Sequence, residues 1–347
     1  MKLESLLTWS AQEYRDLPWR KNRSLYRTLV SEIMLQQTTV GTVKNHFERF
    51  LTRFPDLQSL ASATEDELLV AWKGLGYYRR ARSLKKIAEA LARDHDGKFP
   101  VSAEHLQSIS GIGPYTANAL LSIGMDRPAL ALDANLERVI ARLFGLKSMK
   151  GIKLQREIQQ LFSDGKIFTA KHSPRALNEA LMDLGRTHCQ ARKASCELCH
   201  LKKDCVSFKE GKPLHYPTGA EKISAGKKVE HELQLLRAFV IKEGKLLVYK
   251  KNEKEWLSGQ YEVPTFILKS TDKKLSQYPA IKFKTTPGVV HYKSGITKYS
   301  IDNVLEIMDE KTFKTLKFSR PVVWRDIASE DSNFTTATLK GLAKTTG

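Results

Sequence analysis

The chain has 347 residues, of which 41% are hydrophobic and 27% charged, as in an ordinary globular protein. This length exceeds what one core usually holds, so we expect two domains. No apolar run approaches the ~18 residues of a membrane span, and no signal-peptide pattern opens the chain. These features indicate a cytoplasmic or nucleoid-associated protein with no membrane partner.

The charge is strongly positive, because 57 Lys and Arg residues face only 38 Asp and Glu residues, a formal +19. A basic surface attracts polyanions, and phosphate neutralisation supplies most non-specific affinity for DNA. Nucleic acid is therefore the first candidate partner. The charge alone is equally compatible with a protein that is merely basic.

Helical periodicity dominates the first two hundred residues. Apolar side chains recur every three to four positions over 25–34 and again over 40–51. A capping box at 64–67 predicts the start of another helix, and 84–93 has helical character. No comparable strand pattern precedes residue 210, so we predict an all-helical first domain.

The composition changes near residue 207. Residues 208–230 are polar, basic and interrupted by Gly and Pro, which predicts a linker. Strands are then expected at 233–241, 245–249, 289–292, 297–307 and 321–324, and a helix at 335–344. Glu243-Gly244 predicts a hairpin turn between the first two strands. The prediction is a multi-domain chain with a helical domain over 1–207, a linker over 208–230 and an α+β domain over 231–347.

All four cysteines lie between residues 189 and 205, in the pattern C-x6-C-x2-C-x5-C formed by Cys189, Cys196, Cys199 and Cys205. Such clustering indicates one site rather than a disulfide framework. Four thiolates hold either a tetrahedral zinc ion or an iron–sulfur cluster. In both cases the site is closed by protein ligands and is not expected to be catalytic.

A second motif is the segment 109–117, in which Gly111 and Gly113 flank an apolar residue between two expected helices. Glycine permits a tight turn and a close approach of the backbone, and the N–H groups at the start of the second helix, near Thr116, point toward a potential phosphate. The segment is similar to a helix-hairpin-helix, which contacts the DNA backbone without reading sequence. Alone, two such glycines would indicate only a turn.

The cysteine spacing resembles the iron–sulfur loop of the endonuclease III superfamily. This resemblance implies a [4Fe-4S] cluster, with structural zinc as the alternative. In bifunctional members of the superfamily, a lysine after the hairpin forms a Schiff base with the sugar. Tyr115 stands at that position, and tyrosine cannot form an imine. The resemblance therefore favours a monofunctional hydrolase.

Several further stretches resemble the MutY-type adenine DNA glycosylases, over roughly residues 10–210. The matching stretches are 15–20, 31–38, 74–78, 132–135 and 177–180. The resemblance implies a base-excision-repair enzyme, monomeric by analogy, that flips adenine mispaired with 8-oxoguanine or guanine out of double-stranded DNA and hydrolyses its N-glycosidic bond. The alternatives are an endonuclease III-like glycosylase and lyase for damaged pyrimidines, and an inactive DNA-scanning module.

Excision of adenine requires protonation of a ring nitrogen and stabilisation of an oxocarbenium-like sugar. Glu32 precedes three apolar residues, a setting that raises a carboxyl pKa and suits a general acid. Asp133 is the candidate for stabilising the sugar. Without the resemblance, Glu32 would be interpreted as a solvated helix residue and Asp133 as a helix N-cap.

The resemblance assigns further roles in substrate recognition. It implies that Glu32 protonates N7 and that Tyr115 and Glu179 hydrogen-bond in the adenine pocket. It also implies that Gln37 and Tyr77 enter the DNA stack, although they could be plain surface and core residues. The other residues expected near the substrate are Trp19, Arg20, Thr38 and Leu75.

The stretch 256–264 resembles the Nudix-like domain at the C-terminus of adenine glycosylases. Between residues 265 and 281 the only acid is Asp272, so the acidic box of a Nudix hydrolase is missing and we expect binding rather than pyrophosphohydrolysis. The stretch 291–295 aligns with the family's lesion-reading loop. Ser294 is retained there, whereas Lys293 and Gly295 depart from the pattern. Ser294 is the candidate lesion reader; an exposed basic strand is the alternative.

Overall fold

The structure is a computed structural model that describes residues 3–149, 151–167, 171–218, 230–296 and 298–345. Its contacts divide the chain into two compact units, one formed by residues 1–63 and 75–224 and the other by residues 64–74 and 225–347. Within the described residues, no helix is long and apolar enough to cross a membrane.

The linker expected over 208–230 falls partly on residues 219–229, which lie outside the described residues. The preceding stretch is packed rather than extended. Short helices occupy Val206–Lys209 (α12) and Pro213–His215 (η4). Tyr216 is buried, and its carbonyl accepts a hydrogen bond of 3.1 Å from Arg142 Nε.

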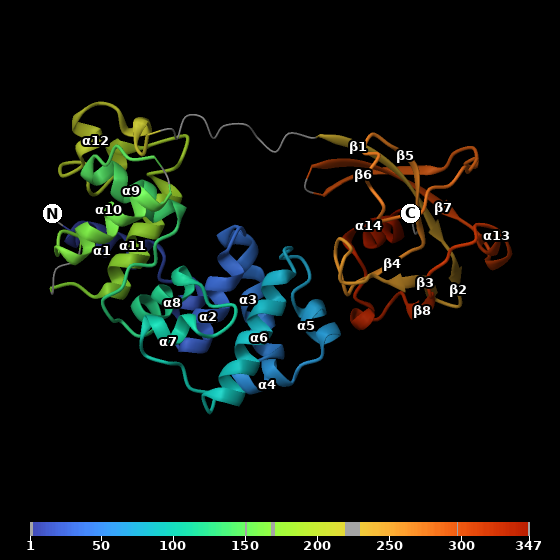
Figure 1. Ribbon diagram of the computed structural model, residues 1–347, viewed down its shortest axis with the longest axis horizontal. Coiled ribbons are helices and arrows are strands. Elements are labelled where there is room, and N and C mark those ends of the chain that lie inside the picture. The colour runs from blue at the N-terminus through green and yellow to red at the C-terminus, as the bar shows by residue number, and fades with distance from the viewer. Residues whose placement is uncertain (1–2, 150, 168–170, 219–229, 297, 346–347) are drawn as a thin grey trace. The chain divides into compact units, whose positions relative to one another are not determined.

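Apart from one isolated bridge between Cys189 and Ala194, the regular elements described up to residue 218 are helices (Figure 1). The remaining ones, in chain order, are α1 (Glu4–Glu13), η1 (Pro18–Arg20), α2 (Leu25–Leu35), α3 (Val40–Arg53), α4 (Leu57–Ser62), α5 (Glu65–Ala71), α6 (Arg79–Asp94), α7 (Ala103–Gln107), α8 (Pro114–Ala119), the π-helix η2 (Leu120–Gly124), α9 (Ala134–Phe144), α10 (Ile152–Ser163), α11 (Pro174–Thr187) and η3 (Cys196–Leu198). The all-helical prediction for this part of the chain is confirmed.

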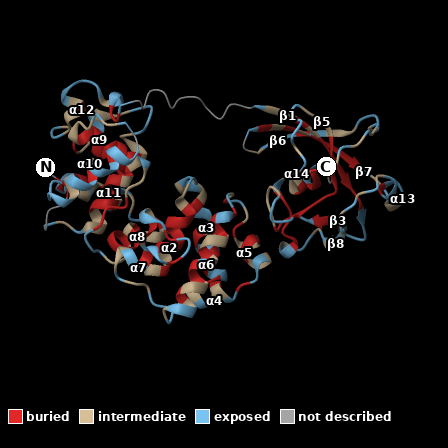
Figure 2. Cartoon of the chain, viewed as in Figure 1, coloured by how far each residue is buried: buried red, intermediate tan, exposed pale blue. Residues whose placement is uncertain are grey.

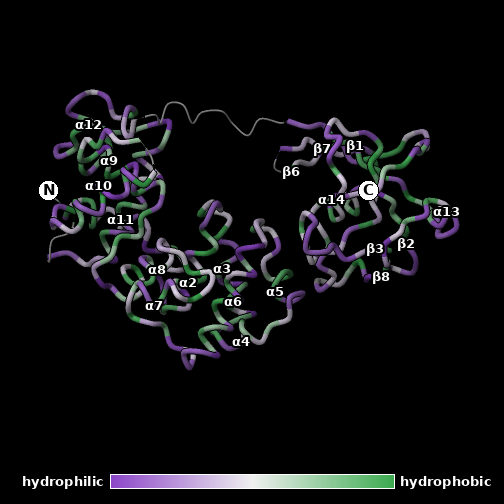
Figure 3. The backbone as a smooth tube through the Cα atoms, in the orientation of Figure 1, coloured by the Kyte–Doolittle hydropathy of each residue, from purple (hydrophilic) through white to green (hydrophobic). Residues whose placement is uncertain are grey.

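Local signals explain where these helices begin. The capping box predicted at Thr64 and Glu67 is present at the start of α5, with both reciprocal hydrogen bonds formed. Ser24 caps α2 by accepting a hydrogen bond from the backbone N–H of Arg27. The longer helices, such as α3 and α6, turn one apolar stripe inward, so buried and exposed positions alternate along them (Figure 2) and their hydropathy varies in step (Figure 3).

A core cluster forms around α9, α10 and α11. Leu136, Val139 and Ile140 pack there with Leu177 and Leu181. Three of the four cysteines are partly buried against this same cluster. The core therefore positions both α9, which begins next to Asp133, and the cysteine loop.

The residues described from 230 onward in the second unit form two sheets, two α-helices and one short 3-10 helix. One sheet has the order β5-β1-β7-β6, with β1 parallel to β7, and in the other β3 pairs with β2, β4 and β8. This mixture of sheet and helix confirms an α+β unit. The elements are β1 (His231–Phe239), β2 (Ile241–Lys242), β3 (Lys245–Lys250), β4 (Tyr261–Glu262), β5 (Thr265–Ser270), β6 (Val290–Ile296), β7 (Tyr299–Ile307), α13 (Glu310–Thr315), β8 (Val323–Asp326), η6 (Glu330–Ser332) and α14 (Thr336–Thr345).

The predicted turn at Glu243-Gly244 is present, with both residues at positive φ as a tight two-residue hairpin requires. Its first arm differs from the prediction, because the short β2 pairs with β3 whereas β1 belongs to the other sheet. The strand signal of 233–241 thus spans two strands that separate at Val240.

A group of charged residues lies inside this unit. Glu262 accepts hydrogen bonds from Arg237 at 2.6 Å and from Lys251 at 2.5 Å, and all three side chains are buried. Although burial opposes ionisation, the two cations lower the pKa of Glu262 to about 2. Buried charges persist only when paired and hydrogen-bonded, as these are.

Candidate active site

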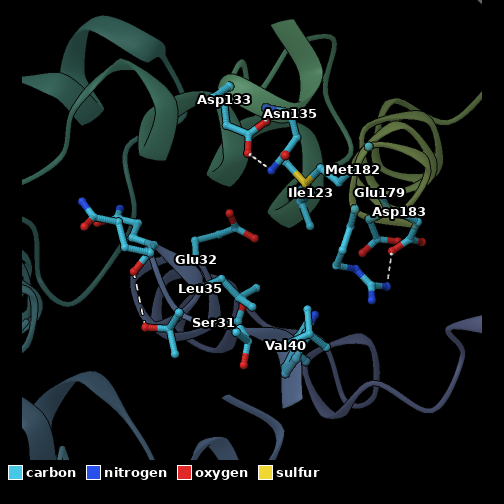
Figure 4. Close-up of a pocket in the computed structure, with 18 of the residues that line it drawn as sticks. Ser31, Glu32, Leu35, Val40, Ile123, Asp133, Asn135, Glu179, Met182 and Asp183 are labelled. Atoms are coloured by element: carbon cyan, nitrogen blue, oxygen red, sulfur yellow. Dashed lines mark hydrogen bonds and ion pairs between the residues drawn. The ribbon is translucent and has the colours of Figure 1, made fainter. Parts of the chain in front are cut away.

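A cavity of about 1150 Å³ lies within the helical unit. Its walls include α2, the N-terminal end of α8, the start of α9, and α11 (Figure 4). The cavity brings together residues that are far apart in sequence and that the sequence singled out. They are Trp19, Arg20, Glu32, Gln37, Thr38, Tyr115, Asp133 and Glu179.

Glu32 is a buried acid of this cavity with a raised pKa. It lies on α2 and is only 5% exposed. The hydroxyl of Tyr115 donates a hydrogen bond of 2.5 Å to its Oε2 atom. Burial, together with the negative charges of Asp133 and Glu179, raises the pKa of Glu32 to about 7, although the bond from Tyr115 opposes the increase. A carboxyl group with this pKa is protonated in a useful fraction of molecules near neutral pH.

Asp133 faces the same cavity from the start of α9, as Figure 4 shows. Its Oδ1 atom accepts hydrogen bonds from the backbone N–H groups of Asn135 and Leu136 at 2.9 and 2.8 Å. Its Oδ2 atom accepts one of 2.8 Å from the Asn135 side chain. Asp133 is thus the helix N-cap of the alternative interpretation, and it lines the cavity as well.

Glu179 lies on α11 and is held by arginines. Arg23 donates two hydrogen bonds, of 2.8 and 3.1 Å, to its two carboxylate oxygens. Arg20 approaches it at 3.7 Å and pairs more closely with Asp183, at 2.8 Å. Sequence reasoning missed Arg23, because nothing in a lone arginine between Asn22 and Ser24 indicates a partner 156 positions away.

Trp19 is half-buried at the edge of the cavity, where its ring meets that of Phe47 edge-on at 5.8 Å. It therefore contributes both to the core and to the cavity wall. Leu75 and Tyr77 are not among the lining residues. Leu75 is buried, whereas Tyr77 is 50% exposed.

Gln37 and Tyr77 share an unusual backbone conformation. Both are exposed, and their φ angles are +56° and +46°, in the left-handed region that residues other than glycine rarely adopt. Each lies in a turn, one after α2 and the other before α6. Thr38 follows Gln37 in the first of these turns, and its hydroxyl is 3.5 Å from the carbonyl of Leu75 in the second.

The helix-hairpin-helix segment folds as expected, with α7 and α8 joined by a turn over 108–113. Gly111 has a φ of +102° and lies against Ile87, so a larger side chain would be strained there. Gly113 is exposed at the start of α8. The side chain of Thr116, in contrast, is only 3% exposed, so the phosphate contact predicted near it would fall to backbone N–H groups.

The four cysteines converge in one loop and form no disulfide. Arg142 donates a hydrogen bond of 3.3 Å to Sγ of Cys189, and Sγ of Cys205 is 3.3 Å from the Ser207 hydroxyl. Burial raises the pKa of Cys199 to about 11, and the other three thiols contribute to the increase.

A chain of hydrogen bonds links this loop with the cavity. The Asn135 side chain bonds Asp133 at 2.8 Å and accepts one bond of 2.9 Å from Arg138. Arg138 then donates 2.8 Å bonds to the carbonyls of Cys189 and Gly185. Folding of the loop and orientation of Asp133 are therefore structurally connected.

Ser294 lies in the second unit, on β6 rather than in a loop. It pairs with Ile301 of β7, and its hydroxyl accepts a hydrogen bond of 2.8 Å from Asn303. Its neighbours His291 and Lys293 are exposed and lie near Asp302. The stretch 291–295, which was aligned with a loop, is part of the hairpin formed by β6 and β7, in agreement with the strand predicted at 289–292 and with the alternative of an exposed basic strand. Lesion reading by Ser294 stays a prediction.

Comparison with known proteins fits this geometry. Residues 30–164 match the family described as HhH-GPD superfamily base excision DNA repair protein. The adenine DNA glycosylase of Buchnera aphidicola subsp. Schizaphis graminum is 30% identical over 318 residues, which cover 90% of this chain and 89% of the relative. The human adenine DNA glycosylase is 37% identical over 58% of this chain and 38% of its own length.

Among solved structures, a thermostable thymine-DNA glycosylase superposes with a TM-score of 0.54 at 29% identity, covering 60% of this chain and 95% of the other. The helical unit and its cavity thus define a helix-hairpin-helix DNA glycosylase of base-excision repair. Because one relative matches along nearly its whole length, the chain belongs to the adenine DNA glycosylase family. The predicted family is confirmed.

Proposed function

We propose that the protein excises adenine from double-stranded DNA in which it is mispaired with 8-oxoguanine or guanine. The observation that carries this proposal is Glu32, a buried carboxyl group with a pKa of about 7 that shares a cavity with a second carboxylate. The formal charge of +19 supports binding to a polyanionic duplex. The names of the relatives support adenine as the base removed.

In the proposed reaction, the flipped adenine enters the cavity and Glu32 donates its proton to N7. The bond between C1′ and N9 then breaks, and its electron pair stays with the adenine. The Asp133 carboxylate stabilises the positive charge that develops on the sugar, and water adds to C1′ while its proton passes to the ionised Glu32 carboxylate. Tyr115 orients Glu32 through its hydrogen bond, and Glu179 accepts a hydrogen bond from the base.

Further residues contribute to recognition in this proposal. Gln37 and Tyr77 enter the DNA stack from their exposed turns, and Thr38 and Leu75 support those turns. Gly111, Gly113 and the backbone N–H groups near Thr116 contact a phosphate. Trp19 and Arg20 form the rim of the cavity.

The four thiols fit a [4Fe-4S] cluster held by Cys189, Cys196, Cys199 and Cys205. They form a donor set of sulfur alone, with an Arg142 N–H directed at one of them. When bound, the cluster would cross-link the loop, and no step of the reaction requires it.

The second unit is proposed to be a Nudix-like domain that binds the DNA lesion. Its one acid in the region of the missing acidic box, Asp272, is engaged by the Tyr299 hydroxyl at 2.5 Å. Ser294 keeps its proton available for donation, because its oxygen already accepts a bond from Asn303.

The experiment that tests the proposal is single-turnover adenine release from two matched duplexes, with A opposite 8-oxoguanine and A opposite guanine. Release of adenine from either duplex would support the proposed activity. Faster release opposite 8-oxoguanine than opposite guanine would support lesion reading by the second unit. Glu32→Gln should abolish release from both. No release from either by the wild-type protein would contradict the proposed function.

A further inference from the structure

Arg80, on the first turn of α6, holds together the two turns that carry Gln37 and Tyr77. Its guanidinium group donates to the carbonyls of Ile33 and Met34 at 2.9 and 2.7 Å, and also to the carbonyl of Gln36. The same group donates to Thr38 Oγ1 and to the carbonyls of Leu75 and Gly76. These last three bonds are 2.9, 3.1 and 3.3 Å long, respectively.

These acceptors belong to three different features. Ile33 and Met34 are in the last turn of α2, whose final carbonyls lack partners within the helix and favour a cation. Gln36 and Thr38 belong to the turn that carries Gln37. Leu75 and Gly76 belong to the turn that carries Tyr77. The planar guanidinium group serves all three because its donors diverge in a fixed fork.

The two turns need such support because of their backbone. Left-handed φ angles at Gln37 and Tyr77 cost free energy and persist only where the surroundings enforce them. Arg80 is only 9% exposed, and its guanidinium carbon lies 5.4 Å from the centre of the Tyr77 ring. It therefore fixes the exposed aromatic side chain directly as well as through the backbone.

We propose that Arg80 is a positioning residue that fixes Gln37 and Tyr77 in one arrangement, so that extrusion of the target base depends on it while cleavage of an already unpaired base does not. This inference rests on the proposed function. Arg80 is not among the residues that line the cavity, and the hydrogen bonds described above join it to the end of α2 and to the two turns.

The test compares two duplexes, one with adenine opposite guanine and one with the same adenine opposite a tetrahydrofuran abasic analogue. Arg80→Met should slow release from the first by on the order of 100-fold, because misplaced groups lose much of their contribution. Release from the second should fall by less than about 3-fold, since no base pair must be opened there. Arg80→Lys keeps the charge but not the fork, so it should show the same selectivity with a smaller loss.

Extrusion itself can be followed with 2-aminopurine placed beside the target adenine in the A:G duplex, in the Glu32→Gln background. Its fluorescence should rise with Arg80 present and fail to rise with Arg80→Met. Arg79→Met is the matched control, because Arg79 is the exposed neighbour on the same helix and carries the same charge. Arg79→Met should leave unchanged the ratio between the rates of adenine release from the two duplexes.

Equal losses on both duplexes in Arg80→Met and in Arg80→Lys would overturn the inference, since they would indicate a general effect on the fold. An Arg79→Met variant that reproduced the selective loss would also overturn it, in favour of simple charge attraction. If the wild-type protein released no adenine from any duplex, the proposed function would fail, and this inference with it. If the wild-type protein released adenine and the Arg80 variants lost the same factor in rate on both duplexes, only the proposed role of Arg80 would be rejected.

Discussion

The hydroxyl of Tyr115 lies 2.5 Å from Oε2 of Glu32, which joins two residues 83 positions apart in the chain. Glu32 is buried and Tyr115 is partly buried, and burial is the main cause of the raised pKa of Glu32. The hydrogen bond acts in the opposite direction, because a donor stabilises the ionised carboxylate. The pKa of about 7 is therefore a balance that substitutions can shift in either direction.

The wild-type pH profile should show this group directly. Glu32 must carry a proton to act as an acid, so the single-turnover rate of adenine release should decrease as pH rises through about 7. Well above that pH, the rate should fall about tenfold per pH unit. Measurement from pH 5.5 to 9 at saturating enzyme separates this effect from DNA binding. A rate that stays constant up to pH 9 would remove Glu32 as the acid.

Tyr115→Phe should shift the profile toward higher pH. The variant loses the hydrogen bond that lowers the pKa of Glu32 and keeps the burial that raises it. The decrease in rate should therefore begin above pH 7, while the maximal rate falls by about tenfold because the carboxyl is less well oriented. The two parameters are obtained from one set of single-turnover measurements. A shift toward lower pH would contradict the role assigned to this bond.

Glu32→Gln should stabilise the protein at high pH although it abolishes activity. The folded-state pKa of Glu32 is raised above its ordinary value of 4.5, so its contribution to stability is complete below pH 4.5 and is lost as pH rises through about 7. The loss amounts to about 3 kcal/mol well above pH 7. Urea unfolding should show the variant to be more stable than the wild type at pH 8.5, with the advantage reduced at pH 5.

Glu104→Gln provides the control for this comparison, because Glu104 is an exposed acid at the start of α7 in the same unit. Its replacement should not produce a stability difference that grows between pH 5 and pH 8.5. If both variants showed the same dependence on pH, the effect would reflect overall charge rather than the buried carboxyl group.

The sequence identified the parts of the site that depend on local patterns. The apolar neighbours of Glu32 indicated its burial, and Asp133 was recognisable as an N-cap. Arginine partners were not predictable, because Arg23 and Arg80 act through contacts 156 and up to 47 positions away. Their acceptors are mostly backbone carbonyls or a carboxylate on another helix, and these leave no periodic signal in the sequence.

The second unit shows the same limit. Long apolar strands such as β1 and β7 were predicted from their pattern, whereas β4 has only two residues and gives no pattern at all. The stretch 291–295 was interpreted by alignment with a loop, but pairing with β7 makes it a strand. Pairing is a tertiary property, and it overrides a short local match.

Arg23 offers a test of how Glu179 recognises the base. Two hydrogen bonds from Arg23 fix both carboxylate oxygens of Glu179, and only the planar fork of arginine makes such a pair. Arg23→Lys keeps the charge but loses this geometry, so we expect adenine release to slow by about tenfold under single-turnover conditions. Lys21→Ala is the matched control, because Lys21 is exposed and pairs with Asp16 outside the cavity. A tenfold loss in the control would show that general charge, not the pair, is responsible.

Glu262 should determine the acid stability of the second unit. Its pKa is lowered to about 2, so its contribution is complete above its ordinary pKa of 4.5 and is lost as pH falls toward 2. Glu262→Gln leaves Arg237 and Lys251 buried without their counter-ion, and removal of one partner from such a group costs about 3–5 kcal/mol. Urea unfolding of the full chain at pH 7, followed by tryptophan fluorescence, measures this loss.

The matched control is Glu310→Gln in the same unit. Glu310 pairs with Lys242 at 3.6 Å, and both side chains are substantially exposed. Exposed pairs contribute less than about 1 kcal/mol, because water solvates each charge nearly as well as its partner does. The Glu262 variant should therefore unfold at a much lower urea concentration than the Glu310 variant. Equal midpoints would mean that the buried ion group contributes no more than a surface pair, and that Arg237 and Lys251 find solvent once Glu262 is neutral.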